Sequence, residues 1–150
     1  MAAGDVVFFD DAIGWLGTEV FQLNTDALKA MFVVDELSVT AGLSGPAYGE
    51  GLTTDLSDSE TDGGNAPTGG TDITNTWSAT SGVGTLDASD IDIEQDGSNP
   101  TDARWMPVYS EEASNNEALF YLDLGGVIDM SAADFGVTWH GSGIATLQQA

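Results

Sequence analysis

Two acidic segments hold the side chains best suited to bind a metal ion. In each, three acids alternate with other residues and a glycine follows: Asp58, Glu60, Asp62 with Gly63, and Asp92, Glu94, Asp96 with Gly97. This spacing opens an EF-hand calcium loop, which a bidentate glutamate closes at the twelfth position. Gly69 and Ala103 occupy that position here, so neither segment is an EF-hand. We expect no cofactor and interpret both segments as solvated loops that associate non-specifically with Na⁺, K⁺, Mg²⁺ or Ca²⁺, while a looser oxygen-ligand site is the alternative.

His140 is the only histidine, and it lies beside Gly141, Ser142 and Gly143. Because the chain has no cysteine, a Ser-His-Asp arrangement is the nucleophilic site to consider. Serine and aspartate are so abundant that their presence is uninformative, and 25 acids place some carboxylate pairs about 5–10 Å apart by chance. We therefore expect no enzyme. A small hydrolase would need a concave pocket that holds His140 and a carboxylate with a perturbed pKa.

The net charge of −23 is the outlying property of the sequence, with 25 acidic residues against two basic ones, Lys29 and Arg104. A small soluble domain typically carries a charge of magnitude about 2–8. The Debye length shrinks from about 10 Å at 0.1 M salt to about 3 Å at 1 M, so concentrated salt screens the self-repulsion. The composition predicts adaptation to brine. It also excludes nucleic-acid binding, which depends on lysine and arginine at phosphates.

The apolar content indicates a folded domain rather than a disordered acidic tail. Hydrophobic residues make up 41% of the chain and include 4 Trp and 6 Phe. No apolar run reaches the 18 or more residues of a membrane span, and the start lacks the basic and apolar regions of a signal peptide. We therefore expect neither a membrane protein nor a secreted one.

Hydrophobic spacing predicts one short helix followed by many short strands. After Asp10 and Asp11, apolar residues recur at helical spacing through Ile13, Leu16 and Val20, and we expect an aspartate to cap this helix. The expected strands are 28–34, 73–77, 85–93, 105–109, 118–124, 135–139 and 144–147. The fold class is therefore mainly β, a single antiparallel β-sandwich or barrel-like domain over residues 1–150 with a short N-terminal α-helix.

Alternation within two strands indicates which side chains form the core. Phe135, Val137 and Trp139 form an apolar face, and we assign Trp139 to the core. In the strand before it, Leu119, Tyr121 and Asp123 alternate with Phe120, Leu122 and Leu124, and the second set is the better core candidate.

Residues 37–72 have neither helical nor strand periodicity and read as a long acidic loop. Ordered loops of this length usually have a function or cover a neighbour. We expect this extended loop and an N-terminal arm, residues 1–9, to contact a partner. The single residues proposed for a partner interface are Lys29, Tyr48, Arg104 and Trp105. For the two cations, an ion pair within the chain is an equal alternative.

Two stretches carry a resemblance to a known family. The first is DDAIGWLGTEVFQLNTDALKAMFVVD, with its Leu23-Asn24-Thr25-Asp26 step and the strand from Lys29 to Val34. The second is ARWMPVYSEEASNNEALFYLDLGGVIDMSAADFGVTWHGSGIATL. Together they are similar to the opening and the ending of the head decoration, or cement, proteins of tailed phages. Residues 37–102 show no such similarity, and the family is normally less acidic.

The resemblance implies a setting rather than a reaction. It predicts a virion protein of a tailed virus of salt-loving archaea, assembled in the host cytoplasm and placed on the outer surface of an HK97-type capsid. Its expected partners are the major capsid protein and further copies of itself, as a homotrimer by analogy. The alternative is a cation- or glycan-binding module of a virion spike, a tail or a cell surface. No catalytic residue comes with the resemblance.

Overall fold

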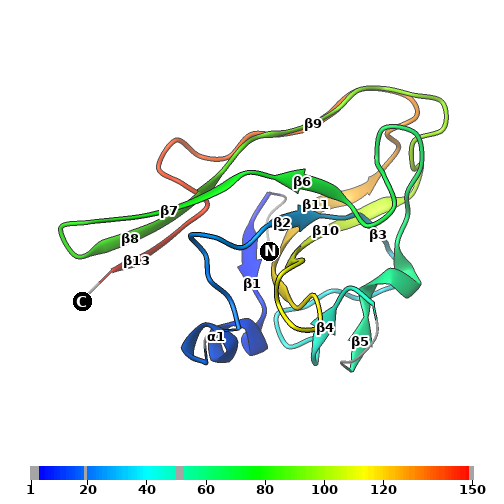
Figure 1. Cartoon of the computed structure of the whole chain (residues 1–150). Coiled ribbons are helices and arrows are strands. Elements are labelled where there is room, and N and C mark those ends of the chain that lie inside the picture. The colour runs from blue at the N-terminus through cyan, green and yellow to red at the C-terminus, as the bar shows by residue number, and fades with distance from the viewer. Residues whose placement is uncertain (1–3, 19, 50–52, 149–150) are drawn as a thin grey trace.

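A six-stranded antiparallel sheet forms the centre of the computed structural model, which describes residues 4–18, 20–49 and 53–148 (Figure 1). Its strands lie in the order β1, β11, β10, β2, β6, and β3 also pairs with β10. They are β1 (Val6–Phe8), β2 (Leu28–Ala30), β3 (Val33–Val34), β6 (Thr71–Ile73), β10 (Ala103–Ser110) and β11 (Ala118–Ile128). Segments from both ends of the chain therefore meet at β10 in the middle of the sheet.

Three smaller sheets and two short helices surround this sheet. β12 (Phe135–Val137) pairs with β9 (Ile91–Ile93), and β8 (Val83–Ala88) lies between β7 (Asn75–Thr80) and β13 (Ala145–Gln148). A short parallel pair joins β4 (Pro46–Ala47) to β5 (Thr54–Asp55). The helices are α1 (Asp10–Gly17) and the 3₁₀-helix η1 (Leu56–Ser59). This arrangement confirms the predicted mainly β, sandwich-like class with one short N-terminal α-helix.

The first half of β11, residues 118–123, is buried on both faces because a layer covers each side of the central sheet there. On one face Phe120 contacts Trp139, with ring centroids 6.3 Å apart. On the other face Tyr121 contacts Phe9 at 5.1 Å. Leu119, Phe120 and Tyr121 are all fully buried. The prediction that the set with Phe120 would form the core in preference to the set with Tyr121 was therefore wrong, because a strand inside a three-layer stack buries both sets.

The layer with β9 and β12 follows the predicted alternation. Ile91 and Ile93 point inward and are buried. Phe135 crosses Phe32 edge-to-face at 5.5 Å. Trp139 is 9% exposed, as predicted for a core residue, and its indole N–H donates to the Ser89 carbonyl at 2.9 Å.

The helix α1 begins without the predicted aspartate cap. Phe9 occupies the N-cap position and makes no side-chain cap bond, so that prediction was wrong. The Asp11 carboxylate instead accepts a hydrogen bond from the Gly45 N–H at 2.8 Å, a contact from far along the chain. The helix ends at Gly17, so Val20 lies beyond it. Asp10 and Asp11 in the first turn still stabilise the helix, because their negative charges interact favourably with the positive end of the helix dipole.

The predicted long loop, residues 37–72, packs on the core over its described part. It contributes the buried side chains Val39, Ala47, Leu56 and Ala66 and contains β4, β5 and η1. Residues 50–52 of this segment, and residues 1–3 of the predicted N-terminal arm, lie outside the described residues. Among the described residues, no helix has the length and apolar character needed to span a membrane.

Candidate interaction surface

Arg104 lies at an irregularity of β10 and is held within the chain. The register shifts between Ala103 and Trp105 against both neighbouring strands, as at a β-bulge. Consecutive strand residues normally point to opposite faces, but here the guanidinium carbon of Arg104 lies 3.7 Å from the centroid of the Trp105 ring. Its Nη1 donates to Asp123 Oδ1 at 2.5 Å, and its Nε lies 3.4 Å from Asp35. The Arg104 hydrogen bond lowers the pKa of Asp123.

Lys29, the other cation, occupies the outward face of β2. Its Nζ lies 3.0 Å from Glu111 and 3.6 Å from Asp72, and hydrogen bonding to Glu111 raises its pKa. The Lys29 side chain is 22% exposed, while its two partners are 43% and 85% exposed. Both predicted interface cations therefore form ion pairs inside the chain in this structure.

Tyr48 and Trp105, the two aromatic residues predicted at a partner interface, also have contacts within the chain. Tyr48 stacks on Tyr109 at 5.0 Å and its hydroxyl donates to Glu60 at 3.1 Å. Glu60 also accepts from the Gly69 N–H at 2.7 Å, and burial raises the pKa of Glu60. Trp105 contacts Tyr121 edge-to-face at 5.9 Å. Glu60 is therefore a structural tie between β4 and the start of β6, rather than a member of an open acidic cluster.

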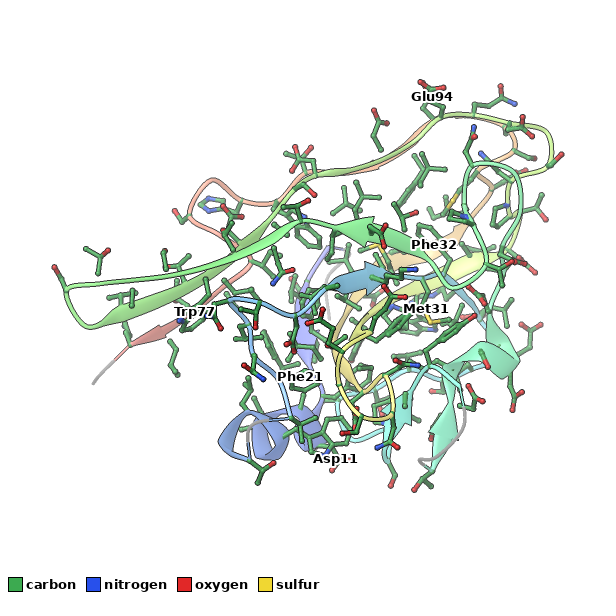
Figure 2. The ribbon with its side chains drawn as sticks, viewed as in Figure 1. Asp11, Phe21, Met31, Phe32, Trp77 and Glu94 are labelled. Carbon is green, nitrogen blue, oxygen red and sulfur yellow. The ribbon has the colours of Figure 1, made fainter. Side chains whose placement is uncertain are left out.

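The remaining acids of the two predicted metal segments point into solvent. Asp58 and Asp62 are exposed, and Asp62 accepts a hydrogen bond from Thr68. Asp92 and Glu94 are exposed, next to the buried Ile91 and Ile93, and Figure 2 shows Glu94 at the outer edge of the molecule. Asp96 accepts from the Ser98 N–H at 2.8 Å within a turn. In the part of the chain that the structure describes, no three His, Asp or Glu side chains are grouped as ligands for one ion.

Asn99 connects the two acidic segments, which sequence reasoning missed. Its side chain is 4% exposed and donates to the carbonyls of Glu94 at 2.8 Å and Met130 at 3.2 Å. Its amide oxygen accepts from the Asn65 N–H at 2.7 Å. A Cβ on Gly63 would lie 2.3 Å from the Ser98 carbonyl oxygen, so only glycine permits this approach. The glycine pair at 63–64 was the available signal that two loops meet here.

His140 lies at a hollow of about 480 Å³ between the N-terminal strand and the segment that leads into β13. The hollow is also lined by Asp5, Val6, Leu122 and Trp139. The His140 ring accepts the Ser142 backbone N–H at 3.1 Å through Nδ1, which orders the turn before β13. This contact gives the histidine a structural role and brings no serine hydroxyl to the ring.

The strands β7, β8 and β13 form a three-stranded projection, here called the arm, that extends past the central sheet above α1 (Figure 1). Alternation gives it two faces. The pairs Trp77–Leu86 and Leu86–Ala145 place apolar side chains on one face, while Thr76 pairs with Asp87 on the other. The ring of Trp77, labelled in Figure 2, lies against Gly84, where a Cβ would come within 2.4 Å of it.

An apolar groove of about 340 Å³ lies between the apolar face of the arm and α1, and is called the arm groove below. Its lining residues carry no charge: Phe8, Ile13, Leu16, Leu23, Trp77, Leu86, Ala145, Thr146 and Leu147. Ile13 and Leu147 are 60% and 72% exposed. Sequence reasoning did not predict this surface, because it depends on the position of β13 relative to the helix.

These surfaces combine an uncharged apolar groove with exposed acidic turns. Comparisons with protein-family models, curated proteins and solved structures find no match to this chain.

Proposed function

We propose that this chain is a structural virion protein that decorates and stabilises the outer surface of an HK97-type capsid in concentrated salt. It binds the major capsid protein and associates with itself, as a trimer by analogy with the family it resembles. Its work is mechanical: bound subunits bridge neighbouring capsid proteins and help the shell resist the pressure of the packaged DNA.

The observation that carries this proposal is the mutual pairing of the two family-like stretches. The first stretch contains β2 and β3, and the second contains β10 and β11. Val108 pairs with Ala30 in β2, and Trp105 pairs with Val33 in β3. The segments that resemble the decoration proteins thus pair with one another in the central sheet. The dissimilar residues 37–102 supply β6 at the edge of that sheet, β9 of the covering layer, and two of the three strands of the arm, β7 and β8. If the similarity of the two stretches were accidental, there would be no reason for them to pair with each other in the fold.

The charge distribution supports an exterior position. Phosphates inside a filled head would repel a chain of net charge −23. The two cations cannot offset this, because Arg104 and Lys29 are already paired with acids of the same chain. The outside of the shell, bathed in salt, avoids this repulsion.

We assign the capsid contact to the predicted loop, residues 37–72, in whose described part Asp58 and Asp62 are exposed. Asp58 lies in η1 and is exposed, while the helix is anchored by Leu56, which is fully buried. An anchored, exposed loop presents a fixed shape to a partner without paying ordering entropy on binding.

The test is co-sedimentation of the purified chain with capsid shells of its own virus, stripped of this protein, in molar salt. We expect saturable binding to shells and none to isolated tails, and a low-resolution particle map should place the added density on the outer surface. Binding to tails or spikes alone, or specific stabilisation by calcium beyond sodium of equal ionic strength, would replace the proposal with the module alternative.

A matched pair of variants locates the contact. Asp58→Arg lies in the proposed contact loop, and Asp92→Arg makes the same change at an exposed acid on β9. We expect the first to weaken shell binding and the second to leave it unchanged. Equal effects would contradict the loop assignment while leaving shell binding itself intact.

A further inference from the structure

We infer that the arm groove is a self-association surface, and that the apolar face of the arm of a second copy covers it. The inference rests on the self-association in the proposed function and names the surface that carries it. It follows from the exposure of the groove, from the distribution of charge and from the free edge of the arm.

Exposed large apolar side chains concentrate at this groove. The described residues contain three such side chains, Ile13, Val127 and Leu147, with exposed fractions of 60%, 54% and 72%. Ile13 and Leu147 line the arm groove from opposite sides, whereas Val127 lies near the end of β11 and is not among the lining residues. Contiguous exposed apolar surface on a soluble protein usually marks an interaction site. The pairing of two of these side chains across one groove identifies where that site is.

The distribution of charge indicates that a second copy of this chain, rather than a basic partner, occupies the arm groove. The segments 74–89 and 138–148 make up about a fifth of the 150 residues but contain one of the 25 acids, Asp87. Asp87 pairs with Thr76 on the face opposite to Trp77 and Leu86, and its carboxylate accepts the N–H of Ala88. A basic partner would be recognised by acids, which are missing here. A like-charged copy can approach closely only where charge is absent, and the groove face of the arm meets that condition.

The edge of the arm offers backbone groups to the same partner. In the described chain β13 pairs with β8 only, so its other side is an unpaired edge. Natural proteins commonly protect such edges with lysine, proline or a bulge. Ala145–Gln148 contains no charged residue or proline, and its ladder with β8 is regular over four residue pairs. An arm from a second copy that packs over Leu147 reaches this edge as well.

The test is sedimentation velocity of the purified chain in molar salt, without capsid shells, over a concentration series. Leu147→Asp and Ile13→Asp place a carboxylate in the groove from its two sides. Val127→Asp is the matched control, since it adds the same charge at a similarly exposed apolar side chain outside the groove. Circular dichroism spectra identical to that of the native chain establish that all three variants fold, as expected for exposed positions.

We expect the native chain and Val127→Asp to form the same oligomer. We expect Leu147→Asp and Ile13→Asp to weaken association about tenfold or more, because each carboxylate would be desolvated without a partner. A monomeric native chain in molar salt, or equal association of all three variants, would overturn the inference. Since shells are absent, these results are independent of co-sedimentation. A native chain that is monomeric but still binds shells would refute this inference and leave the proposed function standing.

Discussion

Replacing Arg104 tests whether it contributes more to the stability of the fold than Lys29 does, as the burial of their ion pairs indicates. The Asp123 side chain is 9% exposed and the Arg104 side chain 16% exposed. Arg104→Met would leave the Asp123 carboxylate almost buried without its cation. In contrast, Lys29 pairs with Glu111 and Asp72, which are 43% and 85% exposed. Lys29→Met would therefore leave its former partners in water.

The expected costs differ several-fold. Removing one partner of a buried ion pair typically costs 3–5 kcal/mol, and the residual exposure of Arg104 and Asp123 places the loss near the lower bound, at about 3 kcal/mol. An exposed pair contributes about 0–1 kcal/mol, and molar salt screens it further. For a chain of this size, 1 kcal/mol shifts the melting temperature by about 2–4 °C. Arg104→Met should thus lower it by about 6–12 °C, and Lys29→Met by at most about 4 °C.

The assay is urea unfolding followed by circular dichroism in molar KCl, with the double variant Arg104→Met/Asp123→Asn as the decisive sample. Asparagine removes the unpaired charge and can still accept from the Gly125 N–H, which donates to Asp123 at 2.7 Å. We expect the double variant to recover at least half of the lost free energy. Losses that simply add, or equal losses for Arg104→Met and Lys29→Met, would refute the reasoning.

The same pair predicts a pH dependence. The Arg104 hydrogen bond holds the pKa of Asp123 below its ordinary value of 3.8. A carboxyl whose pKa is lowered in the folded state stabilises the fold above its unfolded pKa and loses that contribution as the pH falls through the folded pKa. The difference in free energy of unfolding between the native chain and Arg104→Met should be constant above about pH 5 and shrink below 3.8.

Three further predictions concern other features. Gly84→Ala should destabilise the fold by about 1–3 kcal/mol in thermal unfolding, because the added Cβ meets the Trp77 ring, whereas Gly97→Ala, which meets nothing within 4 Å, should not. Glu60→Gln should stabilise the chain at neutral pH, because burial raises the pKa of Glu60 above 4.5 and so disfavours its charged form in the fold. The gain in free energy of unfolding should fade on acidification towards pH 4.5, and a gain independent of pH in urea unfolding would contradict this. Dialysis from molar to about 0.1 M salt should lower the melting temperature or dissociate the oligomer, and unchanged melting and sedimentation would refute salt adaptation.

Strands could be predicted from the sequence where one face is apolar and the other polar. The alternation at Phe135, Val137 and Trp139 predicted its face correctly, because this layer has solvent on its outer side. The same reasoning failed for Phe120 and Tyr121, since the central strand is covered twice. Alternation along a strand therefore identifies the buried face only when the opposite face is polar. It does not show when both faces are covered.

Contacts between distant residues could not be predicted. Neither Asp10 nor Asp11 occupies the N-cap of the helix, which begins directly after Phe9. The Asp11 carboxylate instead accepts the Gly45 N–H from another part of the chain. The sequence likewise predicted Glu60 to be a solvated acid, although its carboxylate accepts hydrogen bonds from the Tyr48 hydroxyl and the Gly69 N–H. The cations are the converse case. Their rarity indicated that they were placed, but their partners became evident only from the fold: the bulge at Arg104, and the pairing of β2 with β6 and β10 around Lys29.

The pairing of β2 with β10 has a consequence for how the chain folds. Ser110 pairs with Leu28, so closing this part of the central sheet joins residues about 80 positions apart. Loop-closure entropy grows slowly with length, so the added thermodynamic cost is small, but long-range strand pairing makes folding slow. During synthesis, the apolar strand 28–34 has to wait for β10 to be made. The pairing of β2 with β10 therefore forms late, after most of the chain has been made.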